Sequence, residues 1–354
     1  MAEEKTKIIY TAAGAPQAST LVRHLRENGE QKVELIGLDM NKEVIGRYIS
    51  DDFEQIPRAG SENYNQRILE IVQQKKADVF LNCSGADVPH IAQIKNEIEK
   101  IGTKVLCPSA EMLNKANNKF SLFTTLSNVN DVNVPEFCSP SNLEEFVIKC
   151  QEMGYPKRDL CFKPHISKGS RGFRVLTERF SKRDLLLNHK PTARYMSLDE
   201  FINIFKDEVN FPKLLLMEVA EGEEVDAMTI GFKGEALLTT LKSRDSHRWG
   251  IIDRGQHIER PELIKSVQAI IREIPLDYNL SIQYIGGKII EINPRTSTFI
   301  YQDNLNEPWL AIKLSLGLIE AEDVKKFQNK IDYNYSMIRY MDQIFIDSNQ
   351  NFHT

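Results

Sequence analysis

Glu291, Asn293 and Arg295 are spaced two residues apart at the end of an apolar run that starts at Ile289. On a strand, positions two apart share a face, so the Glu291 carboxylate and the Asn293 amide point the same way. Such oxygen ligands suit Mg²⁺, which keeps other positions for water and substrate phosphates. Arg295, just past the strand, can grip a phosphoryl or carboxylate group with its planar fork. The pattern predicts a metal and phosphate site; the plainer alternative is a strand and turn with solvated charges.

A second candidate is the glycine-containing, basic loop from His165 to Gly172, which separates two apolar runs. Backbone amides of a glycine-rich hairpin can surround phosphate oxygens, and Lys163 on the leading strand would meet the same charge. The spacing does not match a P-loop, so a solvated basic turn is the competing interpretation.

A third candidate joins the apolar run Leu215–Val219 to the acidic turn that ends at Glu224. A purine at such a crossing would bond to backbone groups near Glu218 to Ala220, and Glu224 would accept from ribose hydroxyls. Acidic runs usually face water, and that alternative stays open.

Composition limits the class of protein. The chain has 354 residues, 41% hydrophobic content and a formal net charge of -5, which are typical of a soluble enzyme. No basic excess favours nucleic acid, and no apolar segment is long enough to span a bilayer, so we expect a cytoplasmic protein. Five scattered cysteines without a CxxC pair indicate reduced thiols.

Four short apolar runs alternate with amphipathic stretches near 18–28, 65–76 and 90–101, which predicts a parallel βαβ domain. Its first βα turn contains a single glycine, Gly14. Asp39 ends the second strand, at the position where a ribose-binding acid would lie. Without further glycines the backbone cannot approach a pyrophosphate closely, so a Rossmann-like scaffold without a dinucleotide is favoured. The apolar runs are Ile8–Tyr10, Val33–Leu38, Val79–Cys83 and Val105–Cys107.

The remaining elements predict two further units. A helical stretch opens at Pro108-Ser109 and runs to about Leu126, and a small lid with a helix near 141–153 follows. Beyond Lys213, alternating runs predict a largely antiparallel sheet with helices near 261–273 and 308–316. These runs are Leu214–Val219, Val225–Gly231, Ala236–Lys242, Leu280–Ile285 and Lys288–Ile292.

From about Pro108 to Gly317, the order and spacing of these motifs resemble the ATP-grasp superfamily. The likeness is nearest to the ATP-binding halves of the carbamoyl phosphate synthetase large chain and to related carboxylate-amine ligases. It implies a mixed α/β and α+β fold, with an ATP-grasp unit behind a Rossmann-like pre-ATP-grasp domain. We therefore expect a pre-ATP-grasp domain at 1–109, a linker helix and lid at 110–213, a C-terminal subdomain with the metal site at 214–330, and an extension at 331–354.

The resemblance also implies roles for individual residues. Lys119 and Lys163 would contact ATP phosphates, and Arg295 would steady the transferred phosphoryl group together with Lys163. ATP with two Mg²⁺ ions, or Mn²⁺ in their place, is the implied cofactor set. The implied ATP-binding residues are Lys119, Lys163, Ser167, Gly169, Ser170, Gly172, Glu218, Val219, Ala220 and Glu224, and the implied metal ligands are Gln283, Glu291 and Asn293.

Gln283 takes the place where many relatives have a carboxylate ligand, and strand register tests its role. Gln283 opposes Glu291 if the hairpin loop is Gly286-Gly287-Lys288 or contains an equivalent bulge. A plain two-residue turn at Gly286-Gly287 would instead pair Gln283 with Ile290 and split the site.

The resemblance implies a ligase that activates a small carboxylate as an acyl phosphate and passes it to an amine or a related nucleophile. Two alternatives remain: an enzyme that forms carboxyphosphate or carbamoyl phosphate, and a catalytically silent ATP-binding regulator. Lys242, Arg244 and Asp87 are candidates for substrate contact. The expected partners are small molecules, not nucleic acid or membrane, and a homodimer is the common assembly.

Overall fold

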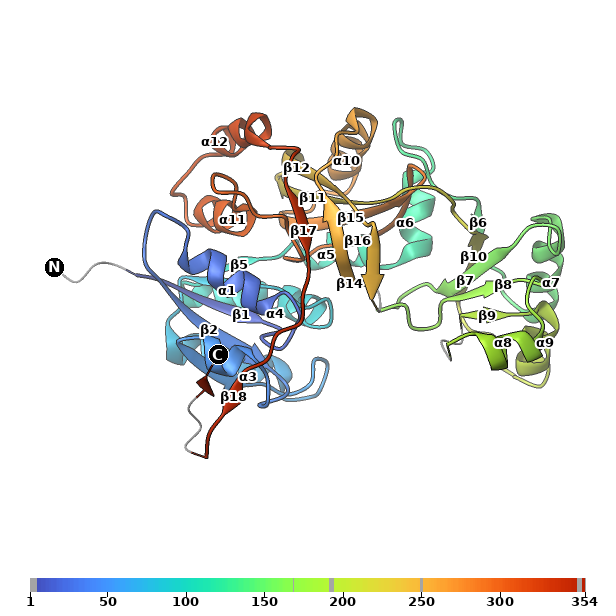
Figure 1. Cartoon of the computed structure of the whole chain (residues 1–354), viewed down its shortest axis with the longest axis horizontal. Helices are drawn as coiled ribbons and strands as arrows, with labels where there is room; N and C mark the ends of the chain where they lie inside the picture. The colour runs from blue at the N-terminus through green and yellow to red at the C-terminus, as the bar shows by residue number, and fades with distance from the viewer. Residues whose placement is uncertain (1–4, 168, 191–193, 249–250, 349–351, 354) are drawn as a thin grey trace.

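The computed structural model describes residues 5–167, 169–190, 194–248, 251–348 and 352–353 (Figure 1). Within these parts of the chain, no helix is both long enough and apolar enough to cross a bilayer. All five cysteines are free thiols, and four of them are buried.

The N-terminal domain is a five-stranded parallel sheet in the order β3-β2-β1-β4-β5 with helices around it. This confirms the parallel fold predicted from the alternating pattern. Strand β3 and the short helix α2 were not predicted, because the strand's sequence, Asp-Phe-Glu-Gln, contains no apolar run. The elements are β1 (Thr6–Thr11), α1 (Ala18–Arg26), β2 (Val33–Asp39), α2 (Gly46–Ile49), β3 (Asp52–Gln55), α3 (Tyr64–Lys75), β4 (Val79–Leu81), α4 (Val88–Ile101) and β5 (Lys104–Leu106).

Two helices, α5 (Ala110–Asn117) and α6 (Lys119–Leu126), replace the single helical stretch expected after this domain. Asn118 separates them with an extended backbone, and its side chain accepts from the Ser121 amide as the N-cap of α6. The break places Lys119 in the first turn of α6, beside the loop that follows His165.

The lid contains its own five-stranded sheet in the order β6-β10-β7-β8-β9. Here one prediction is wrong: Leu214–Glu218 does not belong to the C-terminal sheet but pairs with β7 and β6 in the lid. Its apolar sequence is compatible with either sheet, and only tertiary pairing decides. The elements are β6 (Phe137–Cys138), α7 (Leu143–Glu152), β7 (Leu160–Pro164), β8 (Arg174–Leu176), α8 (Lys182–Asn188), β9 (Tyr195–Met196), α9 (Leu198–Phe205) and β10 (Leu214–Glu218).

The C-terminal subdomain is built on an antiparallel sheet in the order β12-β11-β15-β16, as predicted. A smaller sheet, β13-β14-β17, stands beside it. The elements are β11 (Glu224–Phe232), β12 (Glu235–Ser243), β13 (Ser246–Arg248), β14 (Ile251–Gln256), α10 (Pro261–Glu273), β15 (Tyr278–Ile285), β16 (Lys288–Asn293), α11 (Glu307–Ser315), α12 (Ala321–Lys325), the 3₁₀ helix η1 (Lys326–Lys330), β17 (Ser336–Ile338), β18 (Phe345–Ile346) and β19 (Phe352–His353).

The packing shows which units are joined. One hydrophobic cluster combines β1 and α1 of the N-terminal domain with β12 and α11 of the C-terminal subdomain, and it includes the buried Trp309. The lid has a separate core around Phe146 and Phe201. The N-terminal domain and the C-terminal subdomain therefore form one packed frame, and the lid projects from it (Figure 1).

Candidate active site

The β15-β16 hairpin places Gln283 directly opposite Glu291. The turn is Gly286-Gly287, with φ angles of 55° and 78°, and Lys288 pairs with Ile285. A bulge at Ile290 then restores the pairing of Gln283 with Glu291. The predicted register is confirmed, but the bulge produces it and the three-residue loop does not form.

A row of polar residues crosses the C-terminal sheet. Glu291 pairs with Gln283, Gln283 with Asp226, and Asp226 with Lys242 on four adjacent strands. In the next row, Ser281 pairs with Asn293, which donates from Nδ2 to Glu291 Oε1 at 3.0 Å. The hairpin register thus brings the predicted metal ligands onto one face.

The donor set fits a Mg²⁺ ion that is shared with substrate phosphates. Among the described residues, no group of three or more His, Cys, Asp or Glu side chains is placed to hold a metal alone. Glu291 supplies one carboxylate, and the neighbouring amides of Asn293 and Gln283 can turn either oxygen or nitrogen toward it. Mg²⁺ commonly takes one or two carboxylates and completes its octahedron with water and phosphate.

Glu291, Asn293 and Arg295 line a cleft of about 290 Å³. Lys119, Ser167 and Gly169 line the same cleft, so residues predicted from distant parts of the sequence converge there. The N-terminal domain contributes Gly85 and Ala86.

Two lysines approach Glu291 from different elements. Lys163 on β7 is 6% exposed and donates to the Ile290 carbonyl at 3.2 Å. Burial lowers the pKa of Lys163 to about 8, although the nearby Glu291 opposes the shift. Lys119, equally buried, donates to the Ser167 carbonyl at 3.0 Å, and burial lowers its pKa as well. Both amines lack a directly bonded carboxylate in the hydrogen bonds described, which is the situation an incoming phosphate would relieve.

The loop between β7 and β8 is a tight, left-handed turn. Gly169, Ser170 and Gly172 have φ angles of 58°, 58° and 77°. A Cβ at Gly172 would lie 2.7 Å from Pro164 Cδ, so glycine is required there. Lys168, part of the same predicted loop, lies outside the described residues.

The predicted adenine segment begins at the end of β10. Glu218 is buried, forms ion pairs with Arg158 and Lys288, and accepts from the Glu136 amide at 3.0 Å. Its side chain therefore links the lid to the β15-β16 turn. Val219 and Ala220 follow, half-buried, in the connection to β11; their contact with adenine stays a prediction.

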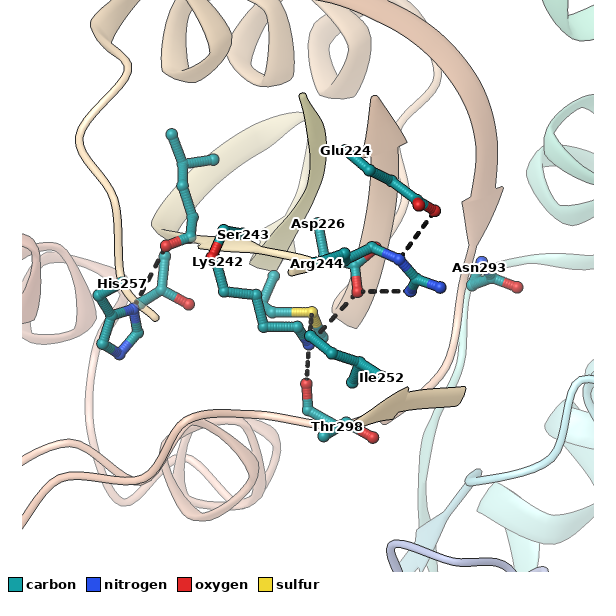
Figure 2. A network of polar contacts seen from close by, with 12 residues as sticks. Glu224, Asp226, Lys242, Ser243, Arg244, Ile252, His257, Asn293 and Thr298 are labelled. Atoms are coloured by element: carbon teal, nitrogen blue, oxygen red, sulfur yellow. Dashed lines mark hydrogen bonds and ion pairs between the residues drawn. The ribbon is translucent and has the colours of Figure 1, made fainter. Parts of the chain in front are cut away.

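Glu224 is held by Arg244, whose Nε lies 2.9 Å from Glu224 Oε1 (Figure 2). The same guanidinium lies 3.1 Å from Asp226 Oδ2. Lys242, 1% exposed, contacts Asp226 at 3.4 Å and donates to the Thr298 carbonyl. Figure 2 shows Lys242 directed toward Thr298 and Arg244 directed toward the sheet edge that bears Asn293.

Asp226, which takes part in this buried network, was not predicted as a site residue from the sequence. The signal was available, because the alternation along β11 puts Asp226 in the row of Gln283. Asp87, a predicted substrate contact, is buried and accepts from Tyr64 Oη at 2.6 Å. Lys242 and Asp87 are thus committed to internal bonds, while a substrate role for Arg244 stays a prediction.

A parallel-sheet domain is followed by a lid and an antiparallel sheet, and the candidate site lies in the cleft that they line. Residues 210–337 match the family model described as ATP-grasp in the biosynthetic pathway with Ter operon. Residues 8–106 match the PylC-like N-terminal domain. Residues 210–337 therefore carry an ATP-grasp domain, which a PylC-like N-terminal domain precedes at residues 8–106. No curated protein matches its sequence significantly.

Solved structures show the same fold at low sequence identity. N5-carboxyaminoimidazole synthetase from Staphylococcus aureus, complexed with ADP, has a TM-score of 0.59 and 15% identity, covering 84% of this chain and 72% of that chain. Biotin carboxylase from Campylobacter jejuni, in a β,γ-ATP complex, has a TM-score of 0.63 and 17% identity, covering 90% and 73%. The 2-oxoglutarate carboxylase biotin carboxylase domain dimer from Hydrogenobacter thermophilus, complexed with MgADP, ADP and bicarbonate, has a TM-score of 0.62 and 16% identity, covering 89% and 70%.

Proposed function

We propose that this chain is a carboxylate-amine ligase, or a ligase for a related nucleophile, that works through an acyl phosphate. A carboxylate oxygen attacks the γ-phosphorus of ATP, the bond to the β,γ-bridging oxygen breaks, and ADP leaves. The nucleophile then attacks the acyl carbon, loses its proton, and releases phosphate that retains one oxygen of the original carboxylate.

The observation that carries this proposal is the convergence of Glu291, Asn293, Arg295 and Lys119 on one cleft beside the glycine-containing loop. Phosphoryl transfer needs positioning and charge neutralisation more than covalent chemistry from the protein. Two buried lysines and the half-buried Arg295 supply the positive charge, and the loop amides supply neutral donors.

Each residue has a distinct task in this scheme. Lys163 and Lys119 bind phosphate oxygens, because each ammonium is buried and bonded to neutral carbonyls. Arg295 steadies the transferred group; burial lowers its pKa, which favours an anionic neighbour. Glu291, Asn293 and Gln283 would hold Mg²⁺, which supplies charge neutralisation at the phosphates when bound. Val219 and Ala220 are the proposed adenine contacts.

The acyl phosphate is testable before the natural nucleophile is known. Hydroxylamine attacks an acyl phosphate and gives a hydroxamate, so the protein is incubated with Mg²⁺-ATP, hydroxylamine and pools of small carboxylic acids. We expect one pool to yield hydroxamate and ADP in equal amounts. ADP release with an acid pool but no hydroxamate would contradict an acyl phosphate intermediate.

A second candidate uses bicarbonate as the carboxylate and forms carboxyphosphate. It is favoured by Gln283 at the position opposite Glu291, since the sequence there resembles carbamoyl phosphate synthetases. ADP release that requires bicarbonate and no other acid would support this alternative. A homodimer is also proposed, by likeness to the dimeric Hydrogenobacter thermophilus domain; light scattering of the purified protein measures it directly.

A further inference from the structure

The C-terminal segment from Ile331 onward crosses from the C-terminal subdomain to the N-terminal domain (Figure 1). It begins with a reciprocal pair, in which Gln302 donates to the Asp332 carbonyl at 3.2 Å and accepts from the Asp332 amide at 3.0 Å. Strand β17 then pairs antiparallel with β14. The segment is therefore bonded both to Gln302, in the chain that follows Arg295, and to β14.

Arg339, the first residue after β17, joins three separate parts of the chain. Its Nε donates to the Ile252 carbonyl at 3.1 Å, and one terminal nitrogen donates to the Pro16 carbonyl at 2.7 Å. The other donates to Thr298 Oγ1 at 3.2 Å. A planar guanidinium with five N–H groups can satisfy three divergent acceptors at once, whereas an ammonium on a flexible stem cannot hold the same geometry.

Thr298 lies three residues beyond Arg295, in the segment that leaves the metal strand. Its carbonyl accepts from Lys242, and the Thr296 amide donates to the Asn82 carbonyl at 2.9 Å. The segment 296–302 is thus attached to the sheet behind it, to the N-terminal domain and, through Arg339, to the C-terminal segment.

Pro16 belongs to the turn that follows β1, and Asn82 directly follows β4. These two strands are neighbours at the point where the order β3-β2-β1-β4-β5 reverses direction. In open α/β sheets, ligands bind in the crevice outside the carboxyl ends of strands at this switch point. Arg295 reaches the same edge, because a Cβ at Gly85 would lie 3.6 Å from its Nε.

We propose that Arg339 is a positioning residue for the second half of the ligase reaction. By holding the 12–16 turn, Thr298 and β14 together, it fixes the wall where the nucleophile approaches the acyl phosphate at Arg295. This inference rests on the proposed function for its chemical meaning, while the clamp itself is a property of the fold. Arg339 does not line the ATP cleft, so ATP binding should not depend on it.

Hydrogen exchange tests the clamp without requiring turnover. In full-length Arg339→Ala, peptides covering 12–16 and 296–302 should exchange at least tenfold faster than in wild type. The lid peptide 198–205 should not change. Arg339→Lys should show the same local effect with the fold intact, since the three-way bond is lost but the charge remains. Arg272→Ala, on the exposed side of α10, is the matched control. Unchanged exchange at 12–16 and 296–302, or equal acceleration everywhere, would overturn the proposal.

A kinetic readout separates positioning from general damage. Arg339→Lys should retain the KM for ATP and the hydroxamate yield with small hydroxylamine. Turnover with a bulkier amine should fall about tenfold or more. A matched loss with both nucleophiles would overturn the positioning role. Absence of ADP release in the wild type would instead count against the proposed function, and the exchange result would then decide the clamp alone.

Discussion

Replacing Lys163 with Met should make the protein more stable and remove ATP binding. Lys163 is 6% exposed and its ammonium donates to one backbone carbonyl, so its charge is poorly compensated before ATP arrives. Met is a near match in length, and it fills the same volume without a charge. Stability and function should therefore respond in opposite directions to one substitution.

The size of the gain follows from the lowered pKa of Lys163, from 10.5 to about 8. At 1.36 kcal/mol per pKa unit, this corresponds to about 3 kcal/mol of destabilisation. Between pH 8 and 10.5 the unfolded chain binds more protons than the folded protein, so stability rises with pH in that window. Below pH 8, Lys163 is charged in both the folded protein and the unfolded chain, so the full destabilisation of about 3 kcal/mol is present. The variant should thus exceed the wild type by up to about 3 kcal/mol at pH 7, and the gap should close near pH 10.5.

Urea denaturation at pH 7 and at pH 10.5 measures this gap, and calorimetry with Mg²⁺-ATP measures binding. Lys265→Met, on the exposed face of α10, controls for the chemistry of the replacement and should leave both quantities near wild type. A Lys163→Met protein that is less stable at both pH values, or that binds Mg²⁺-ATP as tightly as wild type, would refute the reasoning.

Three further predictions concern buried polar groups and the hairpin turn. Burial raises the pKa of Glu307 to about 8, so the contribution of this group to stability should fall as pH rises from 4.5 to 8; Glu307→Gln should match the wild type at pH 4.5 and exceed it by about 4 kcal/mol at pH 8 in urea titrations. Tyr64→Phe removes the 2.6 Å bond to buried Asp87 and should cost about 1–3 kcal/mol of unfolding free energy, with an unchanged midpoint contradicting the bond's role. Gly222→Ala places a Cβ 2.8 Å from Gly286 Cα at a φ of 121°; it should lower the thermal midpoint by several degrees, and a midpoint equal to wild type would show that the turn tolerates a side chain.

Local patterns in the sequence predicted the parallel N-terminal sheet and most of the C-terminal sheet, because apolar alternation directly records burial. The family resemblance implied that Gln283 faces Glu291, and the strand register confirms this pairing. The bulge at Ile290, which produces this pairing, was predicted only as an alternative to a three-residue loop. A one-residue insertion in a strand cannot be recognised from the apolar pattern alone.

Two features depended on tertiary contacts that local patterns do not contain, and a third depended on a local helix cap. Strand β10 pairs in the lid, and its apolar sequence fits either sheet. Asn118 divides a helical stretch through a cap that needs its side chain turned back to Ser121. Lys242 looked like a substrate contact at a strand end, yet it points inward to Asp226 and Thr298. For β10 and Lys242 the partner was distant in sequence, whereas Asn118 caps an amide only three residues away.

ADP release from Mg²⁺-ATP by the purified protein tests the central claim most directly. The assay is run with pools of amino acids, other small carboxylates and bicarbonate, for wild type, Glu291→Ala and the control Glu97→Ala on the exposed face of α4. We predict stimulation by one pool, retained in Glu97→Ala and reduced at least a hundredfold in Glu291→Ala, in keeping with about 3 kcal/mol for a lost charge-stabilising contact. Equal ADP release by Glu291→Ala and wild type would contradict the assignment of this cleft as the active site.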